Sequence, residues 1–179
     1  MNRDRELLRH YLAATAYRAQ KAVRDAPGHY PEFSAGHLVR TPVDIVRHMA
    51  SLMGFAQTLF RGGTYPVRPE PLPTFAAEVA RFHEQLQGLA DLLASDAPLS
   101  ISHEQLLQGP LADVMTHVGQ LAMLRRLADD PVAPENFVHA DVRADRLGRH
   151  QPVPARPDAE WPERPATADP GTSTGRNTP

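Results

Sequence analysis

The stretch from Thr41 to Gly63 constrains the fold more than any other part of the sequence. Apolar side chains recur there every three or four residues, which is the spacing of a helix with one buried face. Thr41 is a preferred N-cap residue, Pro42 suits the first helical position, and Asp44 completes a pattern like a capping box. Gly62 and Gly63 end the pattern, as glycines commonly do after a helix. Such a helix must bury its apolar face against other elements.

Three further stretches show the same helical spacing. We expect a first helix over about Asp4 to Asp25, a third over about Thr74 to Ser95, and a fourth over about Pro110 to Ala128, with Pro110 as its first residue. Long connections follow the first helix, around His29 to His37, and the second, around Tyr65 to Pro73. Because no convincing strand pattern accompanies these helices, the sequence predicts an all-α protein: an antiparallel four-helix bundle with crossover connections.

The C-terminal part of the chain differs in composition. Residues 1–150 form the expected bundle domain, in which Glu135 to Gly148 adds a short helix or an ordered arm lying on the bundle. Residues 151–179 are rich in proline, alanine, threonine and glycine, with Trp161 as the one large apolar residue. Such a segment buries too little apolar surface to offset the entropy lost on ordering, so we expect a disordered tail.

Composition excludes several classes of function. The formal net charge of −2 argues against a protein that binds nucleic acid through phosphate contacts. No apolar run is long enough to cross a membrane, and the charged start from Met1 to Glu6 is unlike a signal peptide, so we expect a cytoplasmic protein. The chain has no cysteine, which excludes disulfides, thiolate metal ligands and a cysteine nucleophile. A transition-metal site would therefore have to use histidine and carboxylate ligands.

Three side chains on two of the expected helices suit such a site. Asp113 and His117 are four residues apart and therefore share one face of the fourth helix, beside its apolar stripe. His48 lies at the edge of the apolar stripe of the second helix. Metal sites in bundles are commonly built from inward side chains on facing helices. Two histidines and one carboxylate leave coordination positions open for water or substrate, as in catalytic zinc or non-haem iron sites.

Each of these residues also has a purely structural explanation. A partly buried histidine can bond a backbone carbonyl, and an acid is favoured in the first turn of a helix, which would account for Asp113. Asp44 and His48 are also four apart, but the capping role explains Asp44 fully. The remaining histidines have no partner at metal-ligand spacing, and we expect His83 to lie at the surface.

Two pieces of the sequence resemble the DinB-like (YfiT-like) superfamily. The first runs from Val39-Arg40-Thr41-Pro42 to His48, and the second from Leu107-Gln108-Gly109-Pro110 to His117-Val118-Gly119-Gln120-Leu121. The resemblance covers about Asp4 to Gln151. It implies a four-helix bundle that holds a divalent metal with one histidine from the second helix and two ligands four apart on a later helix.

On those positions this sequence has His48, Asp113 and His117. Many members of the superfamily have a histidine where this chain has Asp113, and related maleylpyruvate-isomerase-like members have a glutamate there. A carboxylate therefore fits the pattern and shifts the expected preference toward harder metals.

The resemblance also implies a function. It predicts a divalent metal ion, zinc first and nickel, iron or manganese as alternatives, which acts as a Lewis acid on water or on a low-molecular-weight thiol. The chain would then be a metal-dependent enzyme, a thiol-dependent transferase or isomerase or a hydrolase, with a small-molecule substrate. The alternative is a non-catalytic metal-binding or stress-response module, of a family named for damage-inducible expression, that forms a homodimer.

Two further features complete the predicted site. Gln120 lies three residues past His117 on the same helical face, where it could position a ligand or a metal-bound water. Its structural explanation is an interhelical hydrogen bond. The loop from Tyr30 to His37 is expected to shape the entrance, because loops of this length often cover a site.

Overall fold

The structure is a computed structural model that describes residues 2–156 of the chain. It is all-helical, with no strand among those residues, which confirms the predicted all-α class. Its elements are the long helices α1 (Arg3–Val23), α2 (Pro42–Arg61), α3 (Phe75–Ala94) and α5 (Ala112–Leu127), the short helix α4 (His103–Leu106), and the turns η1 (Tyr30–Glu32), η2 (Leu107–Leu111) and η3 (Phe137–His139).

The four long helices pack as a bundle in which α1 and α2 occupy opposite corners. Both of these helices contact α3 and α5. Each long helix contributes fully buried side chains to one shared core, for example Leu12, Met49, Leu86 and Leu121. Burying a side chain of this size stabilises the fold by about 2 kcal/mol. The apolar stripes recognised in the sequence therefore meet along the bundle axis.

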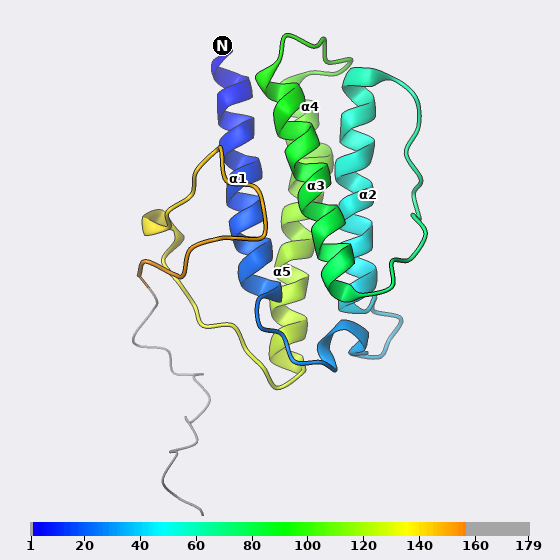
Figure 1. Ribbon diagram of the computed structural model, residues 1–179, viewed down its shortest axis with the longest axis vertical. Coiled ribbons are helices and arrows are strands. Elements are labelled where there is room, and N and C mark those ends of the chain that lie inside the picture. Colours follow the sequence, from blue (N-terminus) through cyan, green and yellow to red (C-terminus); the bar gives the residue numbers. More distant parts are fainter. Residues whose placement is uncertain (1, 157–179) are drawn as a thin grey trace, which may run out of the picture.

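The connections between the helices differ from the expected antiparallel arrangement. The chain descends along α1 and rises along α2, and it then rises again along α3 before it descends through α4 and α5 (Figure 1). Residues 62–74 therefore form a crossover along the outside of the bundle. Residues 24–41 stay at one end of the bundle, so only one of the two long connections is a crossover.

The ends of α2 and α3 lie where the sequence signals place them. The Thr41 hydroxyl accepts a hydrogen bond from the Asp44 amide, and Gly62 ends α2 with a φ of 73°. The Thr74 hydroxyl accepts a hydrogen bond from the amide of Ala77, and Ser95 is the C-cap residue of α3. Side-chain caps thus set both helix starts, and local sequence was sufficient to find them.

The fourth long helix starts close to the expected Pro110, but a short helix that the sequence reading did not expect precedes it. Ser102 and Gln105 form a capping box that starts α4 earlier, since the Ser102 hydroxyl accepts from the Gln105 amide and the Gln105 side chain accepts from the Ser102 amide. The turn η2 then joins α4 to α5 across a kink at Gly109, whose φ of −88° and ψ of −109° are not helical. Pro110 follows directly after this kink, where its missing amide costs no helical hydrogen bond.

Residues after α5 form an arm on the bundle, which confirms the second of the two alternatives for Glu135 to Gly148. The Glu135 carboxylate accepts hydrogen bonds from the Tyr17 hydroxyl (2.7 Å) and the Lys21 ammonium (2.8 Å). The Phe137 ring packs edge-on against Tyr17, with 6.2 Å between ring centroids. The arm therefore lies across α1 (Figure 1).

The arm continues past the domain boundary expected at residue 150. Arg24 donates a hydrogen bond to the carbonyl oxygen of Gln151 at 2.7 Å. Residues 157–179, with Trp161, lie outside the described part of the chain, so the tail expected over residues 151–179 remains a prediction there.

The arm also explains His83, for which the expected surface position is wrong. The side chain is 5% exposed, and its Nδ1 lies 2.6 Å from the Leu147 carbonyl oxygen, to which it can only donate. Its Nε2 lies 3.1 Å from the side-chain amide of Gln20. Burial lowers the pKa of His83 to about 4 and outweighs the hydrogen bond to Leu147. The imidazole is therefore neutral at pH 7.

We expect acid to destabilise the fold through His83. The pKa of His83 in the folded state lies below the unfolded value of about 6.5. The contribution of the neutral, buried imidazole to the free energy of unfolding is therefore complete above pH 6.5 and is lost as the pH falls toward 4. Between pH 7 and pH 5 this loss amounts to about 2 kcal/mol. Urea unfolding of the wild type and a His83→Gln variant at both pH values measures it. Equal pH dependence in the two proteins would contradict this assignment.

Among residues 2–156, no helix combines the length and the apolar character needed to cross a membrane.

Candidate metal centre

The structure brings together the three side chains that the sequence singled out. His48 lies in the second turn of α2, and Asp113 and His117 lie on successive turns of α5, which packs against α2. One ligand atom of each residue lies within 4.8 Å of those of the other two. No other group of three such side chains converges this closely between residues 2 and 156. The juxtaposition depends on the packing of two helices that are about 50 residues apart in sequence.

The distances and the donor set fit a divalent metal ion. The His117 Nε2 lies 3.4 Å from an Asp113 carboxylate oxygen, close to the ligand–ligand separation of about 3.4 Å that a tetrahedral zinc site requires. The His48 and His117 rings meet edge to face, with centroids 4.9 Å apart. Since all three ligand atoms lie within 4.8 Å, small side-chain rotations would close the set. Two imidazole nitrogens and a carboxylate oxygen suit zinc, iron, nickel or manganese.

The three side chains of the candidate site differ in burial, and one side of the site is open to solvent. His117 is buried, His48 is partly buried and Asp113 is exposed. Three protein ligands would leave at least one position of a metal for water or a small molecule. The exposed side at Asp113 is where such a molecule would enter.

Gln120 contacts the site through His117. Its side-chain oxygen lies 2.7 Å from the His117 Nδ1, and an amide oxygen accepts, so Nδ1–H donates. This contact leaves the lone pair on Nε2, the nitrogen that faces Asp113. The partner of Gln120 is thus a residue of its own helix, in place of the interhelical bond considered from the sequence. Outer contacts of this kind orient metal-ligating histidines in many proteins.

The electrostatic surroundings of His48 favour its neutral form. Burial lowers its pKa most strongly, followed by the positive charge of Arg40 and the neighbouring His117, and these effects outweigh the attraction of Asp113. A histidine must be neutral to bind a metal through its lone pair. The pKa of His48 therefore suits the role of ligand.

The helix that carries Asp113 and His117 begins directly after the kinked turn η2. Both residues lie within the regular part of α5, so the four-residue spacing expected from the sequence is kept. The kink at Gly109 changes the direction of the chain just before Asp113.

Two cavities flank the three side chains. One, of about 590 Å³, is lined by His48 together with Arg40, Arg47 and Arg68. The other, of about 660 Å³, is lined by His117 and Gln120 and by apolar side chains that include Val39, Ile45, Met123, Leu124 and Leu127. Arg40 lines both cavities. Small-molecule sites commonly have volumes in this range.

The loop predicted to shape the entrance contributes less than expected. From the stretch Tyr30 to His37, only Ala35 lines either of these two cavities. Residues 67–71 of the crossover line the first cavity instead. Sequence reasoning missed Arg40 and Arg68. Only their positions in the sequence could have pointed to them. Arg40 lies within the Val39–Pro42 piece, and Arg68 lies in a proline-rich connection, where a charged residue is common and gives no signal of a site.

Comparisons of this chain with family models, with curated proteins and with solved structures find no match. The proposal of a function therefore rests on the geometry of the site.

Proposed function

We propose that the chain is a metal-dependent enzyme of the DinB-like type, in which His48, Asp113 and His117 hold one divalent metal ion. Zinc is the metal that the donor set suits best, with nickel, iron or manganese as alternatives. The observation that carries the proposal is the convergence of these three ligand atoms from two helices to within 4.8 Å. The two cavities beside them support a small-molecule substrate rather than a purely structural metal site.

When bound, the metal would supply Lewis acidity for water or for a low-molecular-weight thiol, which suits a thiol-dependent transferase or isomerase or a hydrolase. The residues of the chain itself would bind the substrate and orient the metal ligands. Gln120 holds the His117 ring so that Nε2 faces the centre of the group. The apolar cavity beside His117 would exclude water from the bound substrate.

Metal content and thiol consumption test this proposal. The purified full chain should carry a stoichiometric divalent metal by elemental analysis. It should consume thiol with at least one of a panel of electrophilic substrates, or hydrolyse at least one ester or amide. Chelation should abolish turnover and added metal should restore it. A wild-type protein that takes up no stoichiometric metal under any of these conditions would exclude the proposal.

The non-catalytic module remains a second candidate because of one observation. Met123 and Leu127, on α5, are 58% and 52% exposed. Exposed apolar side chains next to a site often mark an interface, and a homodimer that packs helix against helix would cover them. Stoichiometric metal, no turnover over the whole panel, and a dimer by light scattering would together favour the module.

A further inference from the structure

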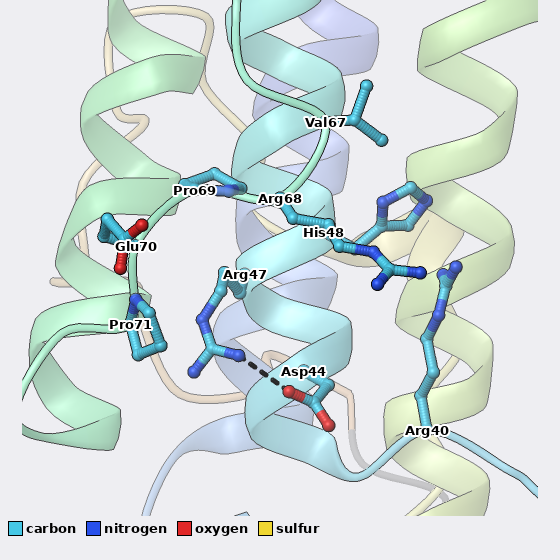
Figure 2. A pocket seen from close by; sticks show the side chains of 9 residues that line it. All are labelled: Arg40, Asp44, Arg47, His48, Val67, Arg68, Pro69, Glu70 and Pro71. Atoms are coloured by element: carbon cyan, nitrogen blue, oxygen red, sulfur yellow. Dashed lines mark hydrogen bonds and ion pairs between the residues drawn. The ribbon is translucent and has the colours of Figure 1, made fainter.

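The cavity on the His48 side is lined by arginine side chains from two separate connections. Arg40 comes from the segment that precedes α2, and Arg68 comes from the crossover between α2 and α3. Figure 2 shows both guanidinium groups directed to the same side of His48, where they approach one another. An anion bound between or beside the two groups would lower the repulsion between their charges.

The charges of Arg47 and Asp44, which also line this cavity, are already paired. Arg47 donates to the Asp44 carboxylate at 2.7 Å and to the Glu78 carboxylate at 2.9 Å. By contrast, neither Arg40 nor Arg68 forms an ion pair with a carboxylate among residues 2–156. Glu70 also lines the cavity, but its carboxylate lies on the α3 side of the crossover, away from the two guanidinium groups (Figure 2).

The crossover that carries Arg68 is held in place at several points. The Ser51 hydroxyl donates to the Pro66 carbonyl oxygen at 2.7 Å, and the Leu72 amide donates to Glu78 at 2.9 Å. Arg81 donates to the Glu70 carbonyl oxygen at 3.0 Å. Prolines at positions 66, 69 and 71 restrict the backbone on both sides of Arg68. The backbone that carries Arg68 is therefore largely fixed before any ligand binds, which lowers the cost of binding.

We propose that Arg40 and Arg68 form an oxyanion subsite, so that the ligand of this protein is a small molecule with a carboxylate or phosphate group bound beside His48. The inference rests on the proposed function for its placement next to a metal, and it adds the chemical class of the substrate. Guanidinium groups bind carboxylates and phosphates through paired, charge-assisted hydrogen bonds. A divalent cation held by His48 would add positive charge nearby and would favour an anion further.

Anion binding by the full-length chain tests the inference. Isothermal titration with inorganic phosphate, benzoate and the neutral benzyl alcohol would be carried out on metal-free and zinc-loaded protein. We expect at least one of the two anions, and not the alcohol, to bind both the metal-free and the zinc-loaded protein. The anion that binds more tightly identifies the ligand group as a carboxylate or a phosphate. Arg40→Ala and Arg68→Ala should each weaken its binding about tenfold, and the Lys variants by less, since they keep the charge.

The matched control is Arg3→Ala, an exposed arginine at the far end of the bundle from the start of α2, which should bind like the wild type. Failure of both anions to bind, or binding that the arginine variants leave unchanged, would overturn the inference. Anion binding seen only with zinc and independent of both arginines would also overturn it, while leaving the proposed function intact. Arginine-dependent binding by a chain that takes up no zinc, nickel, iron or manganese would support the subsite and exclude the metal-dependent function.

Discussion

The His117→Ala protein is expected to bind zinc more than about 100-fold more weakly than the wild type, because loss of an outer hydrogen bond to a ligand alone costs 10- to 100-fold. His117 is the most buried of the three predicted ligands, and its ring is already oriented by Gln120. His48→Ala should have an effect of similar size. Asp113→Ala should have a smaller one, since the exposed carboxylate can be replaced by water.

Competition with a chromophoric zinc chelator measures these affinities. Gln120→Ala should fall between the wild type and the ligand variants, with a loss of 10- to 100-fold. His10→Ala, which removes an exposed histidine of α1, is the matched control and should bind as the wild type does. Circular dichroism checks that each variant is folded. Equal zinc affinity across the folded ligand variants would show that the three side chains do not form a metal site.

The second large effect is expected at Glu78, which is completely buried on α3. Its carboxylate accepts hydrogen bonds from Arg47 of α2 at 2.9 Å, from Arg81, and from the Leu72 amide of the crossover at 2.9 Å. Removing one partner of a buried charged network leaves the others without compensation, which costs about 3–5 kcal/mol. Because the Arg47 and Arg81 side chains are 17% and 15% exposed, we expect Glu78→Ala to cost about 3 kcal/mol.

Thermal unfolding should therefore show a melting temperature lower by about 6–12 °C for Glu78→Ala. Glu84→Ala, an exposed glutamate of the same helix, is the control and should melt with the wild type. A melting temperature for Glu78→Ala close to that of Glu84→Ala would mean that the network contributes nothing measurable.

The same carboxylate should make stability depend on pH in the acid range. Burial raises the pKa of Glu78, but the hydrogen bonds from the Leu72 amide, Arg81 and Arg47 outweigh it and hold the pKa below its ordinary value. A lowered carboxyl pKa stabilises the fold above the unfolded value of about 4.5, and this contribution is lost as the pH falls below it. Glu78→Gln should remove that part of the pH dependence.

Much of the local structure could be predicted from sequence because local contacts cause it. The Thr41 and Thr74 hydroxyls cap the starts of α2 and α3, and apolar spacing defines the buried faces. The short helix α4 was missed, although the capping box of Ser102 and Gln105 is a local signal for it, because it has only four residues and is followed by a kink at Gly109.

The sequence by itself determined the helical class and placed Asp113 and His117 on one face of one helix, since a four-residue spacing fixes that relation. Only the tertiary structure decided that His48 meets them, because that depends on how α2 packs against α5. It also decided that the arm buries His83 and that the crossover carries Arg68 to the side of His48. Such contacts join residues that are far apart in the chain, and they are selected by the packing of whole helices rather than by any local preference.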